Sequence, residues 1–124
     1  ILADELANYC DFFSFGTNDL TQLTYGFSRD DAAKFLNDYY NKDIISEDPF
    51  MHLDINGVGK LVNVAAKLAR HTKNTISLGV CGEHAASEKS IEFFDKIGLD
   101  YVSASPYRVP IAKLAAAKAA LKHK

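Results

Sequence analysis

The stretch Asp11-Phe12-Phe13-Ser14-Phe15-Gly16-Thr17-Asn18-Asp19-Leu20-Thr21-Gln22 decides the fold class, because it joins a short apolar run to a polar loop. Aromatic residues closed by a glycine predict a buried strand that ends in a tight turn. Two later apolar runs follow the same plan: residues 76–80 precede Cys81-Gly82, and residues 101–104 precede Ser105-Pro106. The sequence therefore predicts three strands, each followed at its carboxyl end by a loop of small or polar residues.

Helical patterns lie between and after the predicted strands. Apolar residues spaced three and four apart indicate an amphipathic helix in each of three segments. These residues are Val58, Leu61, Val62, Ala65, Leu68 and Ala69, then Ile91, Phe94 and Ile97, and finally Ile111, Leu114, Ala115 and Leu121. Strands that alternate with helices predict parallel βα units and an α/β fold. Three such units do not close a (β/α)8 barrel, which needs eight and about 250 residues.

The chain opens on Ile1-Leu2-Ala3-Asp4-Glu5-Leu6-Ala7, which has the pattern of the middle of an amphipathic helix. It lacks an initiating Met and shows no basic region, apolar stretch or cleavage site of a signal peptide. A length of 124 residues allows one domain or a part of one. We therefore expect these residues to be a fragment of a longer protein.

Composition argues against two classes of protein. The apolar runs are far shorter than the roughly 18 residues that cross a bilayer, so we expect no membrane contact. Fourteen Lys and Arg stand against 16 Asp and Glu, and the net charge of -2 argues against nucleic-acid binding. Cys10 and Cys81 form neither a disulfide framework nor a Cys-x-x-Cys zinc motif. Their number favours a reducing, cytoplasmic setting.

The loop after the first predicted strand carries groups suited to an anion and a metal ion. Gly16 allows a backbone to approach a ligand, Thr17 and Asn18 can donate hydrogen bonds to oxyanions, and Asp19 offers a hard oxygen to Mg²⁺. Loops at the carboxyl ends of parallel strands are the usual place for such sites. The alternative is structural: Asn18 or Asp19 merely accepts backbone N–H groups as a helix N-cap.

The loop after the second predicted strand contains Cys81, followed by Glu83 and His84. A thiol is mostly protonated at neutral pH, so Cys81 can give a proton to a carbanion or enolate, or act as a nucleophile. Glu83 and His84 are close enough in sequence to tune it. The alternative is a small buried cysteine with a packing role. Cys10, between a helix and a strand, is interpreted as structural.

Other polar residues give weaker signals. Arg108 follows the third strand near a predicted helix start and is a candidate for anion contact. Arg29 lies in what the sequence predicts to be an exposed turn, residues 25–31, ahead of a short helix around residues 35–40. His52, His71, His84 and His123 show no i, i+4 pairing of a metal motif, which argues against zinc.

Four segments of the chain carry a resemblance to the phosphoenolpyruvate-utilising enzymes. The first is the strand and loop at residues 13–22; the others are residues 26–31, Cys81-Gly82-Glu83-His84 and residues 98–103. The last three resemble the pyruvate phosphate dikinase branch more than the phosphoenolpyruvate synthase or Enzyme I branches. The resemblance covers nearly the whole chain. It implies that residues 1–124 are the last part, about strands six to eight, of a C-terminal (β/α)8 barrel that binds phosphoenolpyruvate and pyruvate.

The resemblance also implies roles for particular residues. Gly16, Thr17, Asn18 and Asp19 would bind substrate, Asp19 would also hold Mg²⁺, and Cys81 would protonate the enolate of pyruvate. Two signals that are weak alone would then meet at one face of one barrel. The family usually has glycines after its glutamate-histidine pair, whereas Ala85-Ala86 follow here. That departure bears only on the local backbone conformation.

The resemblance further implies what the chain lacks. The family's phosphate-binding arginines and second Mg²⁺ carboxylate belong to earlier barrel strands, and its phosphohistidine and nucleotide-binding regions are separate domains. Its C-terminal barrel is also the region that dimerises. The leading interpretation is thus a piece of an enzyme that interconverts ATP, phosphate and pyruvate with AMP, pyrophosphate and phosphoenolpyruvate, and that forms a homodimer. The alternatives are a piece of a phosphoenolpyruvate synthase or of Enzyme I, or a non-catalytic dimerisation module.

Overall fold

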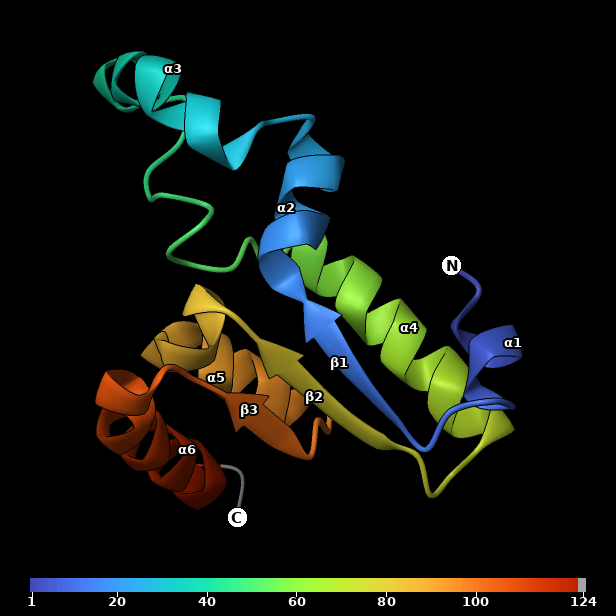
Figure 1. The fold of residues 1–124 in the computed structure, drawn as a ribbon. Coiled ribbons are helices and arrows are strands. Elements are labelled where there is room, and N and C mark those ends of the chain that lie inside the picture. The colour runs from blue at the N-terminus through green and yellow to red at the C-terminus, as the bar shows by residue number, and fades with distance from the viewer. Residues whose placement is uncertain (123–124) are drawn as a thin grey trace.

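The computed structural model describes residues 1–122 and has an α/β architecture (Figure 1). Residues 123–124 lie outside the described residues. They include His123, one of the four histidines that were not expected to bind zinc. The strands are β1 (Phe12–Gly16), β2 (Ser77–Cys81) and β3 (Tyr101–Ser103). The α-helices are α1 (Ala3–Ala7), α2 (Thr17–Tyr25), α3 (Arg29–Asn41), α4 (Val58–Thr72), α5 (Glu88–Lys96) and α6 (Val109–Lys122). Two short 3-10 helices are η1 (Glu83–Ala86) and η2 (Pro106–Arg108).

The strands form one parallel sheet in the order β1-β2-β3, which confirms the predicted βα units. In the register between β1 and β2, Phe15 lies opposite Val80 and Gly16 lies opposite Cys81. Between β2 and β3, Cys81 lies opposite Ser103. The three strands therefore end at one common edge, and the loops that follow them leave from that edge.

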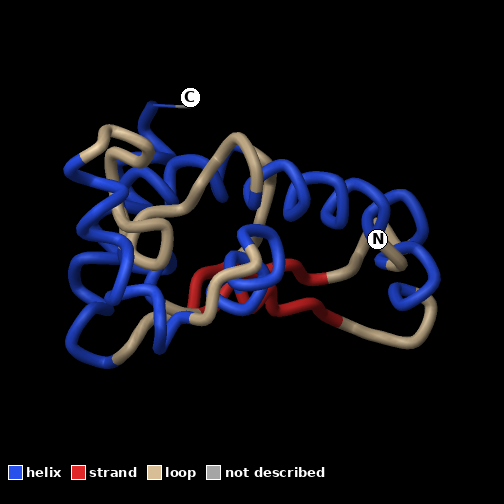
Figure 2. The backbone as a smooth tube through the Cα atoms, turned by 90° about the horizontal axis from the view of Figure 1, so that it is seen from above, coloured by secondary structure: helices blue, strands red, loops and turns tan. Residues whose placement is uncertain are grey.

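Helices cover one face of this sheet, as the view from above shows for α4 (Figure 2). Leu78 packs with Ala66 and Ala69 of α4, and Val80 packs with Val58 of α4 and Phe94 of α5. These side chains are fully buried or nearly so. Because successive side chains of a strand point to opposite faces, their neighbours Gly79 and Cys81 lie on the other face of the sheet.

The uncovered face of the sheet carries both an exposed aromatic residue and a tight contact. Phe12, at the start of β1, is 61% exposed. The ring of Tyr101 lies against Gly79, where a Cβ atom would come within 2.3 Å of the ring carbons. The Tyr101 hydroxyl donates a hydrogen bond of 3.1 Å to the backbone carbonyl of Phe13. Gly79 is thus the residue that allows the tyrosine to lie flat across the central strand.

Two helices differ from the sequence-based prediction. The predicted turn at residues 25–31 is shorter, because α3 already begins at Arg29 and runs for 13 residues. In α6 the buried residues are Ala112, Ala115 and Ala119, whereas Ile111, Leu114 and Leu121 are all more than half exposed. Ala112 and Ala115 pack with Ile91 of α5, so the predicted apolar face of α6 was wrong except at Ala115. Within residues 1–122, no helix has the length and apolar character needed to span a bilayer.

Candidate active site

The common carboxyl edge of the sheet brings together the two loops that the sequence singled out. Gly16 ends β1 directly opposite Cys81, which ends β2, and α2 begins at the next residue, Thr17. A side-chain hydrogen bond joins Asn18 to Glu83 here, although these residues are 65 positions apart in the chain. The structure thus places the predicted substrate-binding residues and the predicted proton donor at neighbouring strand ends.

Gly16 is the N-cap residue of α2, and no side chain caps this helix. The alternative interpretation, in which Asn18 or Asp19 serves as an N-cap, is therefore wrong: both lie inside the first turn. N–H groups of a first helical turn have no partner within the helix and attract anions. Asp19 is exposed, and within residues 1–122 its Oδ1 accepts a long hydrogen bond of 3.4 Å from Gln22. Its carboxylate is therefore open to solvent and to a ligand.

Asn18 is held from the opposite loop by Glu83. Its Nδ2 donates a short hydrogen bond to Glu83 Oε2, and Arg29 Nη2 donates to the other oxygen, Oε1, at 2.5 Å. These contacts with Asn18 and Arg29 hold the pKa of the Glu83 carboxyl below its ordinary value. Asn18 Oδ1 is buried and has no hydrogen-bond partner among the described residues. A buried amide oxygen without a partner is unusual, so the hydrogen bond from Nδ2 to Glu83 is the contact that fixes how this amide is oriented.

His84 holds the residue next to Asn18 and is itself fully buried. One ring nitrogen, Nδ1, lies 2.7 Å from Thr17 Oγ1, and the other, Nε2, lies 2.8 Å from the carbonyl oxygen of Pro49. The Pro49 carbonyl only accepts, so Nε2 carries the proton, and the neutral ring accepts from the Thr17 hydroxyl at Nδ1. Burial lowers the pKa of His84 from its ordinary value of 6.5. A neutral His84 therefore ties three loops together.

The thiol of Cys81 is half-buried and unpaired, and donates a weak hydrogen bond of 3.7 Å to the Phe15 carbonyl. It is not locked in the apolar core, where its neighbour Val80 lies. The hydrogen bonds of Glu83 and His84 go to α2, to Arg29 and to Pro49. These contacts do not include the Cys81 thiol, so they do not provide the predicted tuning. Cys10, the other free thiol, lies just before β1, at the opposite end of the strands.

Two arginines lie near this edge in different ways. Arg29 makes the ion pair with Glu83 described above, with 45% of its side chain exposed. Arg108 is exposed and lines a small cleft of about 140 Å³ together with Gly82, Glu83 and Ser105. The structure therefore brings the loop after β3 beside the loop after β2.

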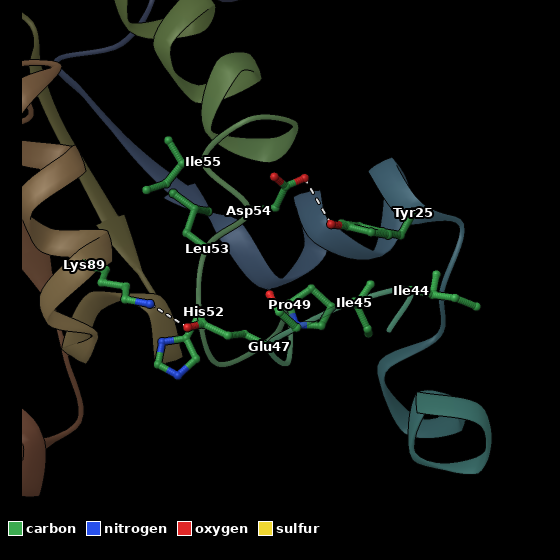
Figure 3. A pocket seen from close by; sticks show the side chains of 11 residues that line it. Tyr25, Ile44, Ile45, Glu47, Pro49, His52, Leu53, Asp54, Ile55 and Lys89 are labelled. Atoms are coloured by element: carbon green, nitrogen blue, oxygen red, sulfur yellow. Dashed lines mark hydrogen bonds and ion pairs between the residues drawn. The ribbon is translucent and has the colours of Figure 1, made fainter. Parts of the chain in front are cut away.

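A larger cleft of about 380 Å³ lies at the other end of α2 (Figure 3). Its walls come from Tyr25, Lys89 and the segment 44–55. The Tyr25 hydroxyl donates to Asp54 Oδ2 at 3.1 Å, and Lys89 forms an ion pair of 2.5 Å with Glu47. Burial, with the Asp54 carboxylate nearby, raises the pKa of Tyr25. None of Gly16, Thr17, Asn18, Asp19 and Cys81 lines this cleft.

Comparison with known proteins places the chain in a class. The sequence profile described as "PEP-utilising enzyme, PEP-binding domain" matches residues 1–121. The chain belongs to this family of phosphoenolpyruvate-utilising enzymes.

Within this family, the chain is similar to proteins named pyruvate, phosphate dikinase. It is 57% identical over its whole length to the one from Clostridium symbiosum and 60% identical over 96% of its length to the one from Rhizobium meliloti (strain 1021). Identity to pyruvate, phosphate dikinase 2 of Oryza sativa subsp. japonica is 54% over 98% of the chain. The chain spans only 13–14% of the length of these relatives.

Proposed function

We propose that these residues are the C-terminal phosphoenolpyruvate- and pyruvate-binding part of a pyruvate phosphate dikinase. The whole enzyme would interconvert ATP, phosphate and pyruvate with AMP, pyrophosphate and phosphoenolpyruvate. The observation that carries this proposal is identity of 54–60% to pyruvate, phosphate dikinases along almost the entire chain. The parallel sheet, covered by helices on one face only, is what strands six to eight of a (β/α)8 barrel would present when taken alone. Residues 1–124 would then be one partial barrel domain.

The proposed substrate-binding residues are Gly16, Thr17, Asn18 and Asp19. Backbone N–H groups at the start of α2 face the carboxyl edge of the sheet and suit the carboxylate or phosphate of phosphoenolpyruvate. Gly16 lies against Asp19, since a Cβ atom there would be 3.3 Å from Asp19 Oδ2. A larger residue at position 16 would therefore crowd the carboxylate. The loop combines close backbone approach with hydrogen-bond donors, as an anionic substrate requires.

Cys81 is the proposed catalytic acid. When the phosphoryl group leaves phosphoenolpyruvate, the enolate that remains needs a proton on carbon to become pyruvate. The Cys81 thiol lies at the strand end opposite Gly16, half-buried and holding a proton toward the Phe15 carbonyl. In the reverse direction the thiolate would take a proton from the methyl group of pyruvate. The position of the Cys81 thiol at the end of β2 then determines which face of the enolate receives the proton.

Asp19 is the proposed Mg²⁺ ligand. Among residues 1–122 no group of three or more His, Cys, Asp and Glu comes together as a metal centre. Mg²⁺ sites with one or two protein carboxylates, completed by substrate oxygens and water, are common. The exposed Asp19 carboxylate fits such a site as one ligand, beside the second carboxylate expected from an earlier barrel strand. A bound Mg²⁺ would supply positive charge that stabilises the enolate oxygen.

The proposed partners follow from the proposed enzyme. Phosphoenolpyruvate and pyruvate would bind here, whereas the phosphohistidine and nucleotide-binding domains would lie elsewhere in the full-length protein. The full-length enzyme would form a homodimer through its C-terminal barrel. It would act in the cytoplasm.

The test is an assay of the natural protein that carries this chain. Phosphoenolpyruvate, AMP, pyrophosphate and Mg²⁺ are mixed with the protein, and pyruvate and ATP are followed with coupling enzymes. We expect both products in equal amounts, with an absolute requirement for AMP and for pyrophosphate. Pyruvate formed without pyrophosphate would instead indicate one of the related transferases.

A further inference from the structure

Two consecutive residues after β2 hold two consecutive residues of α2. Glu83 accepts a hydrogen bond from Asn18, and His84 is bonded to Thr17. These contacts connect the loop that carries Cys81 to the loop that carries the proposed substrate-binding groups. The partners are 65 and 67 residues apart in the chain. The relative position of the two loops therefore depends on this pair of contacts.

Glu83 has a second contact that fixes its own side chain. Its two carboxylate oxygens are used separately: Oε2 accepts from Asn18, and Oε1 accepts from Arg29 at 2.5 Å. The Glu83 side chain is 34% exposed, so this ion pair is partly shielded from water. A carboxylate held from both sides cannot rotate without losing one bond to a charged or polar group.

We propose that Glu83, held by Arg29, is a positioning residue that sets which end of the Asn18 amide faces the substrate. This inference rests on the proposed function of the site. Glu83 would act through Asn18 and would not contact the reacting atoms.

The chemistry of the carboxylate gives the direction of this effect. An ionised carboxylate only accepts hydrogen bonds, so the amide of Asn18 must turn its NH2 group toward Glu83. One N–H is then used, and the other remains available to an anionic ligand. If the amide were reversed, its carbonyl oxygen would face the Glu83 carboxylate, and two hydrogen-bond acceptors would oppose each other. Glu83 thereby selects the orientation in which Asn18 is a donor.

Gly82 shows how tightly the amide is enclosed. Its φ of +103° lies in the region that favours glycine. A Cβ atom at this position would lie 2.9 Å from Asn18 Nδ2. Any side chain at position 82 would displace the amide that Glu83 holds. The backbone of Gly82 and the hydrogen bond to Glu83 therefore both constrain the position of Asn18 Nδ2.

The test compares Glu83→Gln with Glu88→Gln in the natural protein that carries this chain. Glutamine has one acceptor and one donor group, so it cannot accept from Asn18 and Arg29 with separate oxygens. Either the Arg29 contact is lost or the Asn18 amide reverses. Glu88 is the matched control, because its exposed carboxylate forms an ion pair with Lys118 on α6, at 3.2 Å, on the protein surface. The probe is oxalate in the presence of Mg²⁺, a planar dianion that resembles the enolate of pyruvate, titrated by calorimetry.

We expect Glu83→Gln to weaken oxalate binding about tenfold, the usual effect of losing one hydrogen bond to a charged group. The KM for phosphoenolpyruvate should rise by a similar factor. The KM for AMP and the melting temperature should match those of Glu88→Gln. A purely structural role would instead shift the melting temperature and all kinetic constants together.

A double-mutant cycle tests whether the effect passes through Asn18. In an Asn18→Ala background, Glu83→Gln should change the affinity for oxalate less than twofold. Equal losses in both backgrounds, or wild-type affinity in Glu83→Gln, would overturn the positioning role while leaving the proposed function standing. Wild-type protein that binds neither oxalate nor phosphoenolpyruvate would overturn both.

Discussion

Replacement of Cys81 by alanine should remove the proposed catalytic acid and leave the fold intact. The side chain is half-buried, and it donates a weak hydrogen bond of 3.7 Å to the Phe15 carbonyl. Loss of such a contact costs less than about 1 kcal/mol. Loss of a general acid costs a factor of about 10² to 10⁴ in rate, or roughly 3–5 kcal/mol of activation free energy. Catalysis should therefore fail in a protein that remains folded.

The assay uses the natural protein and two readouts. Pyruvate formation from phosphoenolpyruvate should fall by the factor above, and so should exchange of the methyl protons of pyruvate with deuterated water, followed by NMR. Exchange of label between AMP and ATP needs no protonation of carbon and should continue. Cys10→Ala is the matched control, because Cys10 is the other half-buried free thiol and lies at the opposite end of the strands.

The reasoning would be refuted by a Cys81→Ala variant that forms pyruvate at the normal rate. It would also be refuted if Cys10→Ala lost as much activity, since the effect would then not depend on position. A parallel loss of label exchange would show that the substitution had damaged more than carbon protonation.

Three further predictions follow from the same structure. Asp19→Asn should weaken Mg²⁺-dependent binding of oxalate at least tenfold, because it removes a charged oxygen at nearly constant volume; unchanged affinity in a calorimetric titration would show that Asp19 is not a ligand. His84 is buried as the neutral ring, and burial lowers its pKa from 6.5. As the pH drops below 6.5, the unfolded chain therefore takes up a proton on His84 before the folded chain does. The melting temperature should fall in this pH range, down to the lower pKa of the folded state. A His84→Gln variant should lose that component, and identical pH profiles would contradict it. The 124 residues alone should self-associate or be only marginally stable, because β1 and β3 are edge strands of the sheet and Phe12 is exposed; a stable, cooperatively unfolding monomer in light scattering and thermal melts would contradict this. They should also have no dikinase activity, because the phosphate-binding arginines and the second Mg²⁺ carboxylate are expected on earlier barrel strands; turnover in a coupled pyruvate assay would contradict this.

Local patterns were sufficient to predict the strands and the loops at their ends. The aromatic run before Gly16 and the apolar run before Cys81 both form strands, and both strands end at the predicted loops. Parallel pairing followed from the alternation with helices, because a crossover helix returns the chain in the same direction. These features depend on spacing within one segment, which the sequence displays directly.

The contacts within the candidate site were not predictable in the same way. Glu83 was expected to act on its neighbour Cys81, but it bonds to Asn18 and Arg29, which are far away in the chain. A side chain in a tight loop points away from the residue two positions earlier as readily as toward it. The apolar face of α6 was missed for another reason. There α6 packs on Ile91 of α5 through Ala112 and Ala115, while the larger Ile111 and Leu114 stay exposed.

The spacing of the paired strands has a consequence for the order of folding. The contact between Leu78 and Asp100 closes a loop of 22 residues, whereas the contact between Phe15 and Cys81 closes one of 66. The entropy of loop closure makes the longer loop costlier by about 1 kcal/mol. We therefore expect β2, α5 and β3 to associate first and β1 to join them last. Until β1 joins, its half-buried Phe13 and Phe15 lack the cross-strand contacts with Leu78 and Val80 of β2.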